Sequence, residues 1–151
     1  MTVTLEVEAG DWQSIADLDA LVKQVTAATL PANENRSIHF LLTDDEAMRE
    51  INREWRGKDK PTNVLSFPAA PQPVPHGEVA HLGDLVLAWE TVSSEATSQG
   101  KTVENHTRHL LVHGLLHLLG FDHETDPDAE LMEQKERDIL SGLGIADPYQ
   151  S

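Results

Sequence analysis

Three histidines stand at a spacing that suits metal binding. His113 and His117 are four residues apart in the segment HGLLHLLGFDH, and His123 follows after Gly120. Side chains four residues apart on a helix lie on one face, one above the other, so these two imidazoles can reach the same ion. Gly120 can adopt the left-handed conformation that ends a helix and turn the chain so that His123 comes back toward the others. The spacing therefore predicts one three-histidine metal site.

The metal that these ligands suit best is zinc, one ion per chain. The sequence contains no cysteine, so a transition metal has only imidazole and carboxylate ligands available. Three neutral imidazoles that leave a fourth position open are typical of catalytic zinc, whereas a structural site would need a fourth ligand. Buried among leucines without a partner, each imidazole would cost about 1–3 kcal/mol. We therefore expect His113, His117 and His123 to bind Zn²⁺, and we count His113 among the catalytic residues.

The spacing alone also fits a class of peptidase. Histidines at relative positions 0, 4 and 10 with a glycine at position 7 resemble the metzincin motif HExxHxxGxxH. Gly114 stands where those enzymes have their catalytic glutamate. Without general-base help, peptide hydrolysis should fall by about 10²–10⁴. A metzincin-like zinc peptidase is thus an alternative that Gly114 disfavours, and a glycine there would leave room for a larger substrate such as an RNA backbone.

Other polar residues near the motif have two possible roles each. His106 and His109 lie on the same helical stripe as His113 and His117, where they either line the approach to the metal or are exposed to solvent. Exposure is the expectation for His106. Asp122 is either a hydrogen-bond partner of an imidazole ligand or a carboxylate in a turn.

Charge limits the substrates and partners that this chain can bind. The sequence has 26 acidic and 11 basic residues, for a formal charge of −15, which argues against indiscriminate binding of nucleic acid by the whole surface. Five of the 11 basic residues nevertheless form a local basic cluster within one short segment: Arg49, Arg53, Arg56, Lys58 and Lys60. It is either a solvated helix face or a patch for phosphates.

Length and hydropathy indicate one domain outside the membrane. A chain of 151 residues has about the commonest length of a single domain. No apolar run reaches the roughly 18 residues of a membrane-spanning helix, and the segment MTVTLEVEAGD lacks the basic start and apolar core of a signal peptide. We therefore expect a cytoplasmic protein with no membrane association.

Hydrophobic periodicity predicts an α/β fold of the α+β type, with a mixed four-stranded sheet and about five helices in a single domain over residues 1–151. Strands are expected at 3–7, 37–42, 63–67 and 83–89. Helices are expected at 12–25, 43–55, 91–98, 104–119 and 128–140, the first capped by Asp11 and the second by a capping box of Thr43 and Glu46. The proline-rich segment 69–81 should be a surface loop that either borders the site or only connects two strands.

Several segments together resemble the YbeY family of metal-dependent bacterial endoribonucleases. They are HGLLHLLGFDH, the upstream WRGKDKPTNVLSFP and LGDLVL, and the C-terminal MEQKERDILSGLG followed by PY, so the resemblance spans about residues 40–149. It implies one α/β domain, one zinc ion held by the three histidines, and cleavage of single-stranded RNA. The implied role is maturation of small-subunit (16S-type) ribosomal RNA and ribosome quality control, with the ribosome and its proteins as partners and no binding of DNA.

The resemblance also assigns a role within the basic cluster. Arg56 corresponds to the arginine that the family uses near its site, where a bidentate contact could stabilise charge on a phosphate. Phe121 stands where the family often has a tyrosine, so a hydroxyl at that position is not required. The hypothesis is phosphodiester hydrolysis with Arg56 and His113 as catalytic residues. The nucleophile, either metal-activated water or the RNA 2′-hydroxyl, stays open, and so does a non-catalytic ribosome-associated module whose zinc only stabilises the fold.

Overall fold

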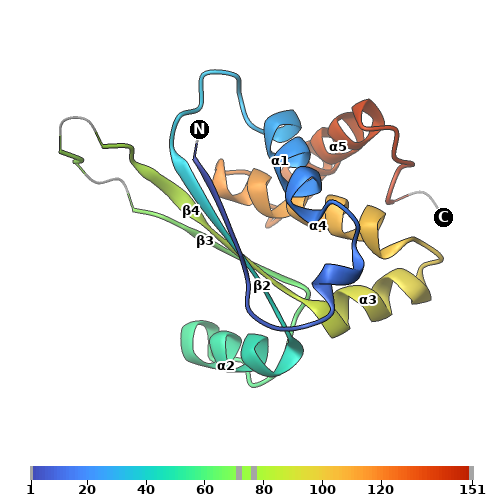
Figure 1. The fold of residues 1–151 in the computed structure, drawn as a ribbon. Helices are drawn as coiled ribbons and strands as arrows, with labels where there is room; N and C mark the ends of the chain where they lie inside the picture. Colours follow the sequence, from blue (N-terminus) through green and yellow to red (C-terminus); the bar gives the residue numbers. More distant parts are fainter. Residues whose placement is uncertain (1, 71–72, 76–77, 150–151) are drawn as a thin grey trace.

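A four-stranded sheet with helices on both faces makes up the fold (Figure 1). The computed structural model describes residues 2–70, 73–75 and 78–149. The strands within this part are β1 (Val3–Val7), β2 (Ser37–Thr43), β3 (Val64–Pro68) and β4 (His81–Ala88). The α-helices are α1 (Leu18–Thr29), α2 (Asp45–Arg56), α3 (Trp89–Ser98), α4 (Val103–Leu118) and α5 (Asp126–Gly142). None of these helices is long and apolar enough to cross a membrane.

The sheet is mixed, as predicted. Its strand order is β1-β2-β4-β3, with β1 and β4 parallel to β2 and β3 antiparallel to β4. This leaves β3 at an edge, and its last residue is Pro68, which has no N–H for a further neighbour. The five helices and the mixed sheet confirm the predicted fold class.

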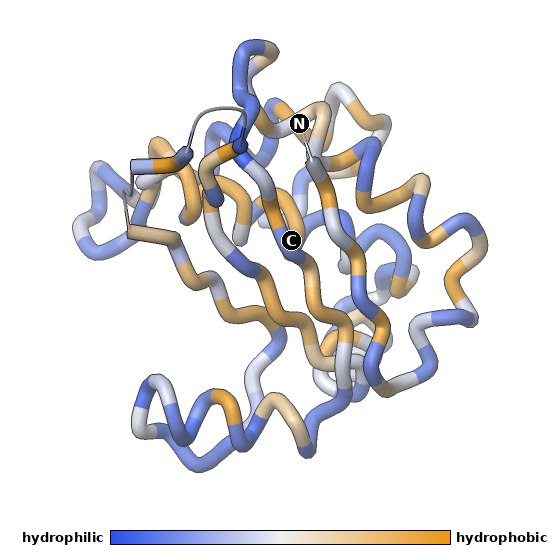
Figure 2. The backbone as a smooth tube through the Cα atoms, turned by 60° about the vertical axis from the view of Figure 1, so that its left-hand side comes forward, coloured by the Kyte–Doolittle hydropathy of each residue, from blue (hydrophilic) through white to orange (hydrophobic). Residues whose placement is uncertain are grey.

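Helices cover the two faces of the sheet unequally. The larger core lies on the face where α1, α4 and α5 pack, and its fully buried members include Phe40, Leu87, Leu111 and Leu115. On the other face α2 contributes Met48 to a small second cluster. In Figure 2, α2 lies at the bottom, below the strands. Most of the buried apolar side chains therefore lie on the face of the sheet that α4 covers, and they fix α4 against the sheet.

The N-terminal helix begins later than predicted. Asp11 precedes only a single 3-10 turn (Trp12–Ser14), and α1 starts after Asp17, which has a positive φ of 53°. The reason is a tertiary contact, because the buried Trp12 indole donates to the carbonyl oxygen of Thr43 at 2.9 Å and packs edge-on against Trp89. The apolar spacing was sound, since Trp12 and Ile15 are both buried, but it did not mark a continuous helix.

The predicted capping box is also wrong. Thr43 is the last residue of β2, and Asp44 caps α2 by accepting a hydrogen bond from Ala47 N at 2.9 Å. The remaining ends agree with prediction within a few residues. In the segment 69–81, residues 71–72 and 76–77 lie outside the described residues, and residues 73–75 are exposed, as expected of a surface loop.

Position 83 requires a glycine because β3 and β4 approach each other closely there. This close approach leads to a first prediction. A Cβ at this position would lie 2.6 Å from both the carbonyl oxygen of Phe67 and Leu118 Cδ2. Because the Phe67 oxygen belongs to the backbone of the paired strand, Gly83→Ala should lower the free energy of unfolding by about 1–3 kcal/mol in urea denaturation. The control is Gly142→Ala at the end of α5, where a Cβ meets open space and stability should stay equal or rise. Equal losses in both variants would contradict this packing.

Candidate metal centre

Helix α4 and the turn after it bring the three histidines together. α4 is capped by Thr102, whose hydroxyl accepts from Asn105 N at 3.1 Å, and its buried leucines fix the helix against the sheet. His113 and His117 lie on its partly exposed side. Gly120 has a φ of 102°, as the predicted turn requires, and Phe121 N donates back to Leu116 O at 3.0 Å. The chain then reverses, and His123 lies beside the other two rings.

The three imidazoles face a common centre. The Nε2 atoms of His113 and His117 are 3.1 Å apart, and the ring centre of His123 is 5.7 Å and 5.2 Å from those of His113 and His117. In a tetrahedral site with Zn–N bonds of about 2.0–2.1 Å, two nitrogen ligands would be about 3.3 Å apart. Within the described residues, no group of three or more His, Asp or Glu side chains is arranged so that it could hold a metal ion as it stands. The three rings are therefore close together without forming a complete coordination site.

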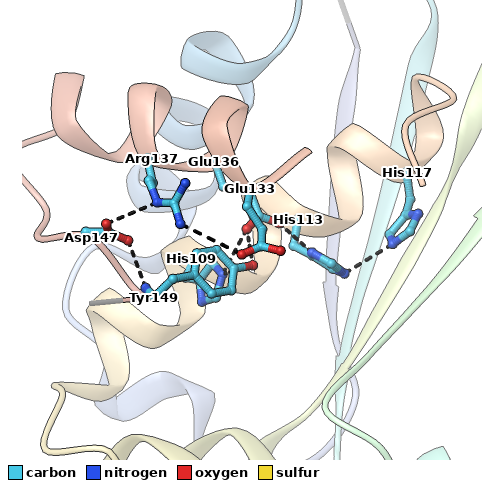
Figure 3. A network of polar contacts seen from close by, with 8 residues as sticks. All are labelled: His109, His113, His117, Glu133, Glu136, Arg137, Asp147 and Tyr149. Carbon is cyan, nitrogen blue, oxygen red and sulfur yellow. Dashed lines mark hydrogen bonds and ion pairs between the residues drawn. The ribbon is translucent and has the colours of Figure 1, made fainter. Parts of the chain in front are cut away.

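A buried carboxylate orients the first of these histidines. Glu136 on α5 is 0% exposed, and its Oε1 accepts from Nδ1 of His113 at 2.5 Å (Figure 3). This hydrogen bond places the proton of neutral His113 on Nδ1 and leaves a lone pair on Nε2, the atom that faces His117. The same tautomer is the one that a metal ligand needs.

Glu136 is kept ionised by its other partners. Its Oε2 accepts from the Tyr149 hydroxyl and lies 3.4 Å from His109 Nε2. Burial by itself would raise the pKa of Glu136, but hydrogen bonds from His109, His113 and Tyr149 outweigh it and lower the pKa to about 2. Both carboxylate oxygens are thus occupied, so Glu136 positions His113 and is not a free base.

The C-terminal segment fixes Tyr149 over this carboxylate. Asp147 accepts from Arg137 Nε at 3.0 Å and from Tyr149 N at 2.8 Å, and the Arg137 guanidinium lies 5.5 Å from the centre of the Tyr149 ring. Burial and the hydrogen bond to Glu136 raise the pKa of Tyr149, which keeps its hydroxyl protonated as a donor. Figure 3 shows these residues as one connected network reaching from Asp147 to His117.

Arg56 lies in the wall of the same pocket. The pocket has a volume of about 570 Å³, and its lining includes the three histidines, His109, Ser66 of β3 and Arg56 at the end of α2. Arg56 forms no ion pair with any other described residue. Burial, together with the neighbouring His113 and His123, lowers the pKa of His117 and favours its neutral form. The pocket therefore combines three imidazoles with a guanidinium that pairs with no described carboxylate.

Gly114 does not open space for a substrate, as the sequence had suggested. It is buried, and a Cβ there would lie 2.6 Å from Leu85 Cδ2 and 3.3 Å from Ser66 Oγ. The space beside Gly114 is thus filled by side chains of β4 and β3. The glycine permits α4 to approach the sheet closely, so the expectation of extra room for an RNA backbone was wrong.

His106 also differs from its expectation of exposure. Its side chain is 3% exposed, and Nε2 lies 2.8 Å from Glu95 Oε1, which also accepts from Asn63 Nδ2 at 3.0 Å. Burial lowers the pKa of His106, against the opposing effect of Glu95. Its role is to join α4 to α3 and to the start of β3. His109, by contrast, does line the pocket.

Of the two predicted roles for Asp122, the structure shows the carboxylate in a turn. Its Oδ1 accepts from Glu124 N at 3.3 Å, and in the part of the chain that the structure describes it has no hydrogen bond to an imidazole. The orienting carboxylate is instead Glu136, which sequence reasoning missed along with Tyr149. One signal was present, because Glu136 stands between Met132 and Leu140 at four-residue spacing, on the buried face of α5.

Comparisons with known proteins agree with this architecture. The family model "Endoribonuclease YbeY" matches residues 6–144. A protein of a Chelativorans species named Endoribonuclease YbeY is 50% identical, covering 98% of this chain and 93% of its own. One of Azorhizobium caulinodans with the same name is 49% identical, covering 99% and 96%. A solution structure from Thermotoga maritima has a TM-score of 0.62 at 21% identity, covering 99% and 100%, and shows the same fold. The chain therefore belongs to the YbeY family.

Proposed function

We propose that this protein is a zinc-dependent endoribonuclease that cleaves single-stranded RNA. Its place would be the cytoplasmic maturation of small-subunit ribosomal RNA and ribosome quality control, with the ribosome and its proteins as partners. Membership of the YbeY family supports the reaction class. The observation that carries the proposal is one pocket lined by His113, His117, His123 and Arg56. That pocket offers nitrogen ligands for a metal ion next to a guanidinium suited to a phosphate.

The donor types in the pocket, neutral imidazole nitrogens, are those that zinc prefers. His113 has its Nδ1 committed to Glu136, so its Nε2 lone pair is available, and the Nε2 atoms of His113 and His117 have nearly the spacing of two ligands. Such imidazole–carboxylate pairs raise the basicity of the ligand and fix its ring. A zinc ion held there would supply Lewis-acid activation of a water molecule or of a phosphoryl oxygen.

Arg56 is the group that would meet the substrate's charge. Its five N–H donors can form two parallel hydrogen bonds to the oxygens of one phosphate, an interaction that strengthens as negative charge accumulates. Because no described carboxylate is paired with Arg56, it does not have to break an ion pair first. Arg56 is the last residue of α2, before Gly57 with its φ of 70°, and it lines the pocket.

Loss of a ligand should remove metal and activity together. We predict that His113→Ala loses bound zinc and the cleavage of ribosomal RNA fragments, measured by metal analysis and by an assay of the same preparations. The control is His81→Ala, an exposed histidine outside the pocket, which should keep both. Cleavage by a metal-free His113→Ala preparation would show that the nuclease is a contaminant.

The same preparations separate the rival functions. Wild-type protein with zinc should cut single-stranded RNA and leave casein intact, because Gly114 provides no general base and is packed against Leu85. Cleavage of casein alone would favour a peptidase. If zinc-loaded protein at high concentration leaves RNA intact while chelation unfolds it, the ion only stabilises the fold and the nuclease proposal is wrong.

Glu136 should control metal affinity through His113. Glu136→Gln keeps the size of the side chain but replaces the anionic acceptor, so zinc affinity should fall about 10- to 100-fold in competition with a chelator. The matched control is Glu130→Gln, an exposed carboxylate on the same helix, which should leave the affinity unchanged. Equal affinities of Glu136→Gln and the wild type would exclude the orienting role of Glu136.

Arg56 should contribute to turnover more than its single charge suggests. Removal of one positioned donor to a developing anion typically costs about 10²–10³ in rate, so Arg56→Ala should show a loss of that order in kcat on single-stranded RNA. Arg49→Ala is the matched control, because Arg49 lies on the same helix but is paired with Asp59 at 2.8 Å. An unchanged kcat for Arg56→Ala would remove this residue from the mechanism.

A further inference from the structure

A second groove lies on the opposite face of the sheet, under α2. This sheet groove has a volume of about 340 Å³ and shares none of its lining residues with the metal pocket. Its apolar lining includes Ile51, Trp55, Phe67 and Val86, and its polar lining is His39 and Asp84. The nuclease reaction described above uses none of these side chains.

Two aromatic rings form the open wall of the sheet groove. Trp55 on α2 is 69% exposed, and the centre of its ring lies 6.2 Å from that of Phe67 on β3. Val86 beneath them is buried with Met48, so the floor is rigid. Single exposed apolar side chains are ordinary, but an exposed indole paired with a second ring over a rigid apolar floor offers a surface for a planar ligand.

The sheet groove and the metal pocket are lined by neighbouring residues on both α2 and β3. Trp55 and Arg56 are adjacent at the end of α2, and Ser66 and Phe67 are adjacent on β3, with one member of each pair in the metal pocket and the other in the groove. Successive side chains of a strand point to opposite faces, and residues are about 3.3 Å apart. An RNA strand with a phosphate at Arg56 can therefore cross β3 and place a neighbouring base at Phe67.

The charges on the two sides of the groove suit a nucleotide whose backbone lies toward α2 and whose base lies in the groove. On the α2 side, Arg53 and Lys58 form no ion pair with any described residue, so they are available to phosphates. On the sheet side, Asp84 Oδ1 lies 3.5 Å from His39 Nδ1 and 3.0 Å from His81 Nε2. A carboxylate there repels phosphate but can accept hydrogen bonds from a base. The groove is thus suited to the base and its α2 rim to the backbone.

We propose that the sheet groove binds a nucleobase of the RNA strand next to the cleaved linkage, stacked on the exposed indole of Trp55, against which Phe67 packs edge-on. This inference rests on the proposed nuclease function and gives it a substrate subsite. Stacking on aromatic rings accepts every base, because each base has a π-face, so the subsite favours unpaired RNA without selecting a sequence. Duplex RNA is excluded because its bases are already stacked.

Tryptophan fluorescence can test this subsite directly. Of the three tryptophans, Trp12 is fully buried and Trp89 is partly buried against it, whereas Trp55 is exposed, so quenching by an added strand reports mainly on Trp55. Zinc-loaded protein is titrated with a single-stranded 2′-O-methyl oligonucleotide, which resists cleavage through its own hydroxyls, and with an abasic strand of the same length. The base-containing strand should quench the emission and bind more tightly. Equal quenching and affinity for the abasic strand would overturn the proposal, since only phosphates would then be recognised.

Variants complete the test. Trp55→Ala should weaken binding of the base-containing strand about 5- to 150-fold, the loss expected for one stacked base, and should raise the KM for RNA. Trp55→Phe, which keeps a ring, should recover part of the loss. Leu131→Ala, which removes an exposed apolar side chain on α5 (53% exposed), should bind like the wild type. Unchanged binding by Trp55→Ala would overturn the subsite, whereas quenching by a wild type that never cuts RNA would overturn only the nuclease function.

Discussion

The arrangement of this site depends on one buried anion. Glu136 is inaccessible to solvent, and an ionised carboxylate is tolerated there only while hydrogen-bond donors surround it. Those donors come from α4, as His109 and His113, and from the C-terminal segment, as Tyr149. Displacing any of them leaves a charge uncompensated in the interior. The buried carboxylate of Glu136 on α5 needs hydrogen-bond donors from α4, and this need fixes the position of α4. It thereby also fixes the direction in which Nε2 of His113 points.

Steric contact on the other side of α4 provides the complementary constraint. Gly114 allows the helix to approach Leu85 and Ser66 so closely that a methyl group would overlap them. α4 is thus held between a charge on one side and the sheet on the other. Ser66 belongs to β3 and lines the same pocket as the imidazoles and Arg56. Gly114 stands where metzincins have a catalytic glutamate, but its role here is to let α4 pack close to the sheet.

The features that could be predicted from sequence are those encoded by local periodicity. His113 and His117 follow from helical spacing, His123 from the glycine turn, and the strands from alternating residues. The features that could not be predicted depend on contacts between distant segments. Helix α1 begins later than predicted because the Trp12 indole donates to the Thr43 carbonyl, and His106 is buried because it contacts Glu95 on another helix. The position of Glu136 among apolar residues of α5 indicated that it is buried. The sequence did not indicate that its hydrogen-bond partner would be His113 on α4.

The large negative charge of the chain has a consequence for how an RNA substrate could approach. A formal charge of −15 repels a phosphate backbone from most directions, and this repulsion decays over about a Debye length of 8–10 Å. Arg53 and Arg56, which form no ion pair with any described residue, lie on α2, across the sheet from α1, α4 and α5 (Figure 1). These two guanidinium groups therefore attract phosphates to the side of the molecule where α2 lies. A single strand can pass over the edge strand β3 and face both grooves, whereas a wide duplex would meet the acidic surface around it.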